Sequence, residues 1–279
     1  MYQIVIDSCG ELTEDLKKDG HFQTVSLEIE IDGYRIRDDE TFDQKDFLRR
    51  VRESADCPKS SCPSPEQYME ACSKEAERVY VVTLSEKLSG SYNSAQLGKQ
   101  LYEEEYRDSK KQIHVFDSRS ASVGETLIAM KIQELEEQGL SFSEVVARTE
   151  EYIDSQHTYF VLETLETLRK SGRLTNLKAL IANTLNIKPV MGSTQDGAIC
   201  QLGQARGMQR ALDKLVQLAA DTVDTETRIL AISHCNCPER AEFVREKLEA
   251  LAKFKKIIII NTAGVSSMYA NDGGVIIAV

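Results

Sequence analysis

The sequence predicts an α/β protein made of two α/β domains. Short apolar runs alternate with amphipathic helical patterns along the chain, which is typical of this class. The length of 279 residues fits two domains at roughly 100–200 residues each. Hydrophobic residues make up 41% and charged residues 28%, as in an ordinary globular protein. The pattern changes character after His157, so we expect an N-terminal domain over residues 1–156 and a C-terminal domain over residues 157–279.

In the first half, apolar runs that stop at small polar residues predict strands. They cover Tyr2–Ile6, Arg78–Leu84 and Ile113–Asp117. Residues Phe22–Arg37 are expected to be extended around an Asp32-Gly33 turn, because Asp-Gly is a strong hairpin signal. Helices are expected over Leu12–Lys18, Phe42–Arg52, a segment beginning at Pro65, Tyr92–Tyr106, Ser122 to about Gln138, and Ser141 to about Ser155, the last opening with a Ser141–Glu144 capping box.

The same signals continue through the second half. Ile187–Met191 and Ala198–Leu202 are expected to form a hairpin around Asp196-Gly197. Further strands are expected over Thr158–Leu162, Arg228–Ser233, Lys256–Asn261 and Val275–Val279. Helices are expected over Leu165–Lys170, Leu177–Leu185, Gln209–Val223 and Pro238–Lys253.

Charge and composition exclude several classes of function. There are 34 Lys and Arg and 45 Asp and Glu, which gives a net charge of −11 and argues against a nucleic-acid partner. No apolar run approaches the ~20 residues that a membrane span needs. The first apolar run breaks at Asp7 and has no basic residues before it, unlike a signal peptide. Seven cysteines, an odd number in a long chain, favour a reduced, cytoplasmic protein.

A Ser- and Gly-rich loop after the second strand is the most informative segment. Residues 79–95 lead from a strand through this loop into a helix. A helix N-terminus offers free N–H groups and a partial positive charge, so it can bind a carboxylate or phosphate without a basic side chain. Ser91, Asn93 and Ser94 would add donors. The alternative is that these residues only cap the helix.

Two further segments carry similar residues. Ser60–Pro65 is a second hydroxyl-rich loop before a helix, and its alternative role is again capping. If both loops converge, several neutral donors could hold one anion. The segment Asp117–Gly124 could line a cleft at the end of a strand, or serve only in capping and turn formation.

Metal and nucleophile motifs are weak. His234-Cys235-Asn236-Cys237 has no second Cys/His pair at zinc-finger spacing, so we expect no metal site. Gly90–Ser94 does not match the G-x-S-x-G elbow of serine hydrolases, and neither the Gly-rich dinucleotide pattern nor the P-loop pattern is present. We therefore expect no enzyme and no cofactor. A hydrolase that uses Ser94 or Ser91 stays open, provided that a His or Lys base lies within reach.

Together these motifs resemble the DegV family of bacterial fatty-acid-binding proteins, which include the fatty-acid-binding subunits of fatty acid kinase. The resemblance covers nearly the whole chain. The motifs that carry it are Ile4–Ser8, Ser60–Pro65, Leu88–Ala95, Asp117–Gly124, Leu168–Leu174, Asn186–Pro189 and Arg206.

The resemblance implies a long-chain fatty acid, such as palmitate or stearate, in a cleft or tunnel between the two domains. Its carboxylate would lie at the hydroxyl-rich loops and its tail in an apolar channel, as in a lipid carrier. It also implies that a separate kinase subunit could act on the bound acid, and that membrane contact could be transient. The residues that match the family's ligand-binding positions are Ser60, Ser61, Asn93, Ser94, Arg173, Arg206 and Tyr269. A lipid-responsive regulatory module is a further alternative.

The chain departs from the family at the expected head-group end. Where the family often has His-Thr-Gly-Pro-Gly, this chain has Tyr269–Gly273, so that Tyr269 replaces the His and Asp272 the Pro. Tyr keeps a hydroxyl donor but does not titrate near neutral pH. Cys62 stands where the family commonly has Gln. These changes put the head-group orientation and the use of a kinase in question.

Overall fold

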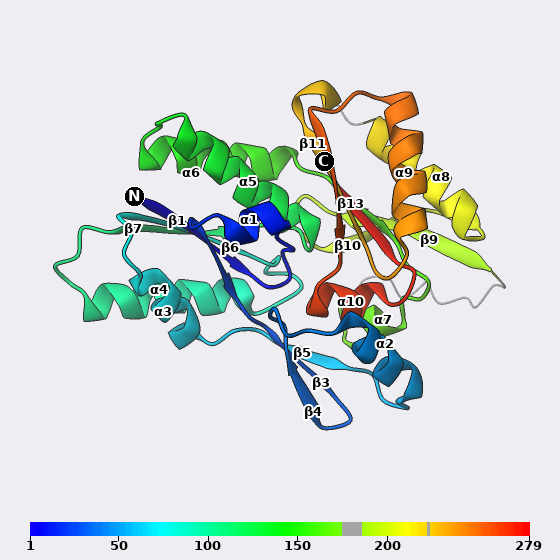
Figure 1. Ribbon diagram of the computed structural model, residues 1–279, viewed down its shortest axis with the longest axis horizontal. Helices are drawn as coiled ribbons and strands as arrows, with labels where there is room; N and C mark the ends of the chain where they lie inside the picture. The colour runs from blue at the N-terminus through cyan, green and yellow to red at the C-terminus, as the bar shows by residue number, and fades with distance from the viewer. Residues whose placement is uncertain (175–185, 222–223) are drawn as a thin grey trace.

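The computed structural model describes residues 1–174, 186–221 and 224–279 (Figure 1). Its first half is organised around a parallel four-stranded sheet in the order β2-β1-β6-β7. The strands are β1 (Tyr2–Asp7), β2 (Phe22–Val25), β6 (Arg78–Thr83) and β7 (Gln112–Asp117). Strand β1 is buried over its last five residues, as expected for a strand that helices cover on both faces.

Helices flank this sheet. They are α1 (Glu14–Lys18), α3 (Pro65–Ser73), α4 (Ser91–Glu105), α5 (Val123–Glu137) and α6 (Phe142–Ser155). The predicted capping box is present, since Ser141 Oγ accepts from the backbone N–H of Glu144 and the Glu144 carboxylate accepts from the backbone N–H of Ser141. Pro65 is the first residue of α3, where its missing N–H costs nothing.

A six-stranded sheet organises the second half, in the order β10-β9-β8-β13-β11-β12. Its strands are β8 (Thr158–Val161), β9 (Ile187–Ser193), β10 (Ile199–Arg206), β11 (Ile229–His234), β12 (Lys256–Asn261) and β13 (Val275–Ala278). The accompanying helices are α7 (Glu166–Lys170), α8 (Met208–Ala220), the 3₁₀ turn η2 (Thr225–Thr227), α9 (Pro238–Leu251) and α10 (Gly264–Ala270). Strands β11 and β12 pair in parallel and the other pairs are antiparallel.

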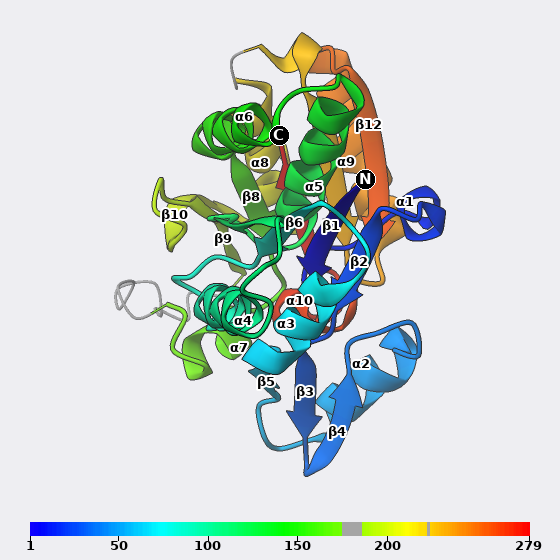
Figure 2. The same cartoon turned by 90° about the vertical axis from the view of Figure 1, so that its left-hand side faces the viewer.

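A small antiparallel sheet completes the molecule. It consists of β4 (Tyr34–Arg37), β3 (Glu28–Ile31) and β5 (Lys59–Ser61), and α2 (Gln44–Glu53) follows β4. Figure 2 shows β3, β4 and α2 projecting below the two larger sheets. The Asp32-Gly33 turn of the β3–β4 hairpin has φ values of 50° and 75°, the left-handed conformation that this turn type needs.

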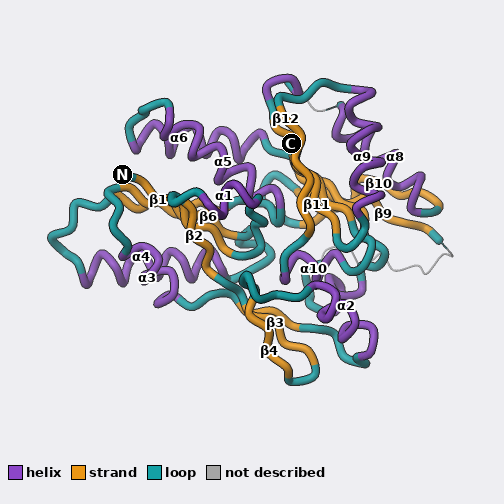
Figure 3. The backbone as a smooth tube through the Cα atoms, viewed as in Figure 1, coloured by secondary structure: helices purple, strands orange, loops and turns teal. Residues whose placement is uncertain are grey.

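The two larger sheets meet through α5 and the ends of the first sheet's strands. Helix α5 contacts β1 and β6 on one side and β11 and β13 on the other, and Figure 3 shows the two groups of strands lying to either side. Ser85, just after β6, donates from Oγ to the carbonyl of Gly197 in the β9–β10 hairpin at 2.8 Å. The division into 1–156 and 157–279 stays a prediction.

Most predicted elements are confirmed, with two corrections. Residues 59–61, expected in a loop, form β5 because they pair with β3. Helix α10 was not predicted at all. The expected helix Leu177–Leu185 lies outside the described residues, as does the end of the helix expected to reach Val223.

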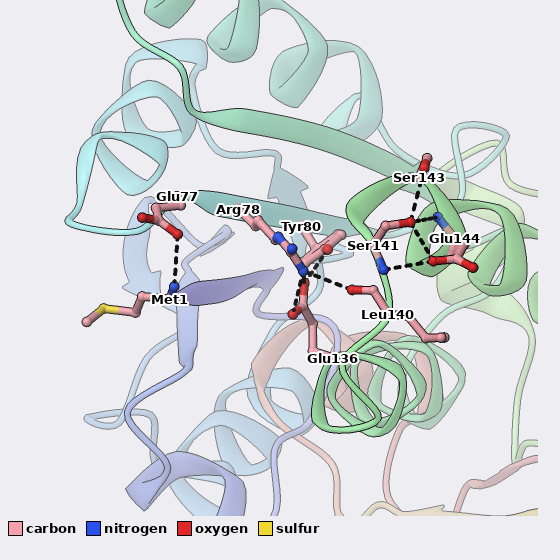
Figure 4. A network of polar contacts seen from close by, with 9 residues as sticks. All are labelled: Met1, Glu77, Arg78, Tyr80, Glu136, Leu140, Ser141, Ser143 and Glu144. Atoms are coloured by element: carbon pink, nitrogen blue, oxygen red, sulfur yellow. Dashed lines mark hydrogen bonds and ion pairs between the residues drawn. The ribbon is translucent and has the colours of Figure 1, made fainter.

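Strand β6, an inner strand of the first sheet, is held at its start by a buried carboxylate (Figure 4). Arg78 donates to Glu136 Oε2 at 3.1 Å and to the carbonyl of Leu140 at 3.0 Å. Tyr80 donates its hydroxyl to the same Glu136 carboxylate. Glu136 is only 6% exposed in its side chain, so these bonds replace its hydration.

We expect Tyr80→Phe to lower the free energy of unfolding by ~1.5–3 kcal/mol, the usual worth of a hydrogen bond to a charged group. Urea unfolding measures the change. Tyr34→Phe, which alters an exposed tyrosine, should change stability by less than about 0.5 kcal/mol. Equal effects of the two substitutions would contradict the role given to the Tyr80 hydroxyl.

Candidate functional site

A cavity lies where the two large sheets and the small one meet. It encloses about 820 Å³ between protein atoms, part of it open to solvent. Its walls come from the loops after β1, β6 and β7, from β8, β9, β10 and β13, and from α7 and α10. The cavity therefore joins both halves of the chain.

Most of the wall is apolar. The apolar lining residues are Leu84, Leu88, Ala121, Phe160, Leu162, Leu168, Ala198, Ile199, Val265, Ala270 and Ile276. Several belong to one hydrophobic cluster that also includes side chains of α2 and β3. Such a wall suits a hydrocarbon chain, which gains roughly 0.8 kcal/mol for each CH₂ removed from water.

Ser60, Ser89, Arg173 and Tyr269 line one part of the cavity, which we call its polar end. The other polar lining residues are Arg119, Ser120, Ser122, Thr158, Ser193 and Ser266. The hydroxyls of Ser60 and Tyr269 lie 3.2 Å apart, and the Arg173 guanidinium lies 5.8 Å from the centre of the Tyr269 ring. Arg173 also donates from Nε to the carbonyl of Leu88 at 3.0 Å, which fixes its position beside the Ser-rich loop.

The two hydroxyl-rich loops converge, which was the condition for a shared anion site. Ser94, in the first turn of α4, donates from Oγ to the carbonyl of Pro63 at 2.5 Å. A Cβ on Gly90 would lie 3.2 Å from the Cys62 sulfur, so the loops pass close to each other there. The Gly90 N-cap makes no side-chain bond to the α4 N-terminus. The Ser94 hydroxyl thus links the two loops, and its only proton is used in that hydrogen bond.

The predicted site residues fall into two groups. Ser60, Arg173 and Tyr269 line the cavity. Ser61, Asn93, Ser94 and Arg206 are not among the described lining residues, and all of these except Ser94 are exposed. A direct ligand contact for these four therefore stays a prediction.

Sequence reasoning missed part of the wall. Cys9, Val265 and Ser266 come from the β1 loop and α10, where no motif was recognised. The segment Asp117–Gly124 was considered as a cleft lining, and its residues 119–122 do line the cavity. Ser89 belongs to a loop singled out from the sequence, but was not itself chosen.

Buried carboxyl groups surround the Cys9 and Ser266 side of the wall. Asp38 accepts from the backbone N–H groups of Gly264 and Val265 at 2.7 and 2.8 Å, which caps α10. Glu11 accepts from the Ser122 hydroxyl at 2.7 Å. Burial raises the pKa of Glu11 to about 7 and that of Asp38 to about 6, despite these hydrogen bonds.

No lysine is among the described residues that line the cavity. None of the four histidines, at positions 21, 114, 157 and 234, is among the described residues that line it. Across residues 1–174, 186–221 and 224–279, no group of three His, Cys, Asp or Glu side chains could hold a metal ion. Within the same residues, no helix is both long enough and apolar enough to cross a bilayer.

Known proteins match the chain from end to end. The family described as "Uncharacterised protein, DegV family" matches residues 1–279. A DegV domain-containing protein of Streptococcus pneumoniae is 35% identical over 262 residues, which cover 91% of this chain and 89% of that protein.

Solved structures are also similar. A DegV family protein from Ruminococcus gnavus, refined with vaccenic acid, is 56% identical, covers 100% of this chain and 99% of its own, and has a TM-score of 0.97. The Fatty Acid Kinase B3 protein of Streptococcus pneumoniae, loaded with linoleic acid, is 31% identical, with coverages of 100% and 98% and a TM-score of 0.87. A DegV family protein from Eubacterium eligens, loaded with heptadecanoic acid, is 25% identical, with coverages of 100% and 99% and a TM-score of 0.90.

Proposed function

The chain belongs to the DegV family, and from its cavity we infer that it binds a long-chain fatty acid. One observation carries this: a largely apolar cavity between the sheets is lined by Ser60, Arg173 and Tyr269, which lie close together and offer two hydroxyls and a guanidinium to a carboxylate. Similar structures that hold vaccenic, linoleic and heptadecanoic acids support the assignment.

The fatty acid lies with its carboxylate at the polar end and its chain along the apolar wall. A saturated C16 chain has 15 carbons beyond the carboxyl, so full burial contributes on the order of 12 kcal/mol. The entropy that the fatty acid and the protein lose on association and ordering offsets several kcal/mol of this gain. The chain therefore supplies most of the affinity, and the polar end sets the orientation of the acid.

The protein acts as a carrier without chemistry of its own. The name of the Fatty Acid Kinase B3 neighbour supports a separate kinase as the partner. Asp272, which stands where the family often has Pro, is paired with Arg52 at 3.3 Å and with Asn236 at 2.9 Å. All seven cysteines are free, which supports a cytoplasmic location.

Uptake of a defined fatty acid tests the function. Protein stripped of lipid is mixed with ¹³C-palmitate and examined by native mass spectrometry. We expect one palmitate per chain and no release of a hydrolysed product from chromogenic acyl esters. Failure to take up palmitate, stearate or oleate would overturn the proposed function, and turnover of the esters would favour the hydrolase alternative.

Arg173→Gln is expected to weaken palmitate binding by roughly 10–100-fold, because it removes a charge-assisted hydrogen bond worth ~1.5–3 kcal/mol. Isothermal titration of the stripped protein measures the change. Arg169→Gln is the matched control, since Arg169 pairs with Glu166 on the surface and is not a lining residue in the described structure. Equal losses in both variants would remove Arg173 from the head-group site.

A further inference from the structure

Helix α10 forms part of the cavity wall but is too short to hold its own position. It has seven residues, of which Val265, Ser266, Tyr269 and Ala270 line the cavity. A helix of this length is not stable alone in water. It lies between the six-stranded sheet and the small sheet (Figure 1) and contacts β3, α2 and α7. These neighbours therefore decide where its cavity-lining side chains stand.

Asp38 of the small sheet holds the start of α10. This residue follows β4 directly and is 2% exposed. Its Oδ1 accepts from the backbone N–H of Gly264 at 2.7 Å, and its Oδ2 accepts from that of Val265 at 2.8 Å. Both N–H groups belong to the helix N-terminus, which has no internal partner for them. No side chain at the N-cap position of α10 replaces this contact.

The contact between Asp38 and α10 leaves no space for a larger residue. A Cβ on Gly264 would lie 2.6 Å from the Asp38 Oδ1 and 2.8 Å from its Cγ. The backbone N–H of Asp38 in turn donates to the carbonyl of Leu27 at 2.9 Å, which fixes Asp38 to the small sheet just before β3. The start of α10 is therefore held in one position relative to this sheet.

The small sheet also meets the far end of α10, at the polar end of the cavity. Ser60 lies in β5, where it pairs with Ile29 of β3, and Tyr269 is the last residue but one of α10. The hydroxyls of Ser60 and Tyr269 are 3.2 Å apart. One sheet therefore carries both Ser60 and the carboxylate of Asp38, which fixes the helix that carries Tyr269.

This arrangement places two hydroxyls before the ligand arrives. Groups that are already in position lose little freedom on binding, so more of their interaction with a carboxylate appears as affinity. If the start of α10 moved away from the small sheet, Tyr269 would leave Ser60. Asp38 itself is not among the described residues that line the cavity, so it acts on the ligand only through α10.

We propose that Asp38 is a positioning residue for the fatty-acid head group: it holds the start of α10 against the small sheet and so places the Tyr269 hydroxyl beside Ser60, where it donates to the ligand carboxylate. The inference rests on the proposed function. It makes the contributions of Asp38 and Tyr269 to affinity depend on each other, because the first residue positions the second.

A double-mutant cycle on palmitate affinity tests this dependence. Asp38→Asn, which retains one acceptor oxygen and loses the other, is expected to weaken palmitate binding about tenfold at pH 7. In a Tyr269→Phe background the same substitution should change the affinity by less than about threefold, since the hydroxyl that it displaces is absent. Asp39→Asn is the control, because Asp39 accepts from Thr41 and should leave palmitate binding unchanged.

Gly264→Ala attacks the same contact from the other side. Its Cβ displaces the Asp38 carboxylate without altering it, so we expect the same loss of affinity and the same disappearance of that loss in Tyr269→Phe. Gly20→Ala is the matched control, since a Cβ there has no atom within 4 Å. Circular dichroism and urea unfolding show whether each variant folds.

Hydrogen exchange in the wild-type protein tests the coupling without a change at Asp38 or Gly264. Because coupling between two sites is reciprocal, palmitate should slow exchange of the Gly264 and Val265 amides. The slowing should be smaller in Tyr269→Phe. This measurement still tests the proposal if the Asp38 and Gly264 variants do not fold.

The outcomes separate this inference from the proposed function. If wild-type protein binds no fatty acid, the proposed function fails. If it binds palmitate, but folded Asp38→Asn binds as tightly as the wild type or loses as much affinity in the Tyr269→Phe background, the positioning role of Asp38 is wrong. Exchange of the Gly264 and Val265 amides that palmitate does not change would overturn it as well.

Discussion

Between about pH 4 and pH 7 the protein is expected to lose several kcal/mol of stability, the reverse of the behaviour of proteins whose carboxylates are paired with cations. Glu11 has a pKa near 4.5 when exposed and about 7 in the fold, and Asp38 rises from 3.8 to about 6. The cause in both cases is burial, which disfavours the charged form. The folded state therefore holds protons that the unfolded chain has released.

The sign follows from this proton balance. Each stabilising contribution is fully present below the unfolded pKa and is lost as the pH rises through the folded pKa. At 1.36 kcal/mol per pKa unit, each of the two groups accounts for on the order of 3 kcal/mol. That is large beside the 5–15 kcal/mol typical of a folded domain. Burial shifts Asp7 and Glu125 in the same direction.

Urea unfolding at pH 4, 5, 6 and 7 measures the effect. We expect Glu11→Gln to flatten the decline between pH 5 and pH 7. Glu134→Gln is the control, because Lys255 lowers the pKa of Glu134, whose contribution is instead lost as the pH falls below its ordinary range. A decline as steep in Glu11→Gln as in the wild type would show that Glu11 is ionised in the fold at neutral pH.

Local signals were enough to predict the regular elements. The apolar run Tyr2–Ile6 became the buried strand β1, and the Ser141–Glu144 capping box starts α6. These elements depend on residues within a few positions of one another, so a window of sequence contains what determines them. The β9–β10 hairpin was predicted for the same reason.

Helix α10 could not be predicted because its stability is not local. It has seven residues, six of them buried, so it lacks the polar face that marks an amphipathic helix. No side chain of its own caps it; Asp38, 226 residues away from Gly264, accepts its first N–H groups. Strand β5 is similar, since residues Lys59–Ser61 are extended only by pairing with β3.

The candidate site also depends on contacts between residues that are far apart in the sequence. The serine-rich loops were correctly expected to meet, but sequence could not show that Ser94 bonds to Pro63 while Ser89 lines the cavity. Nor does anything local distinguish Asp38 from the other acidic residues of an acidic chain. Its burial is set by the packing of α10 against β3, which brings together residues more than two hundred positions apart.

Ala121→Phe is expected to abolish high-affinity palmitate binding while leaving the fold intact. Ala121 lines the cavity in the loop after β7, and we expect the fatty-acid chain to run toward it from Ser60 and Arg173. A benzyl group there occupies the space of roughly four methylenes, whose exclusion costs ~3 kcal/mol, or more than a hundredfold in affinity. Filling a cavity removes no hydrogen bond, so the unfolding free energy should change little.

Fatty acids of different length distinguish a blocked channel from a damaged protein. In Ala121→Phe, a C10 fatty acid should bind nearly as tightly as it binds the wild type, since a short chain never reaches the blocked end, whereas palmitate should lose most of its affinity. Ala55→Phe, at an exposed position before β5, should bind both acids as the wild type does. If Ala121→Phe lowered the affinity for the C10 and C16 acids equally, the acyl chain would not run from Arg173 toward Ala121. In that case Ser60, Arg173 and Tyr269 would not mark the end of the channel where the carboxylate lies.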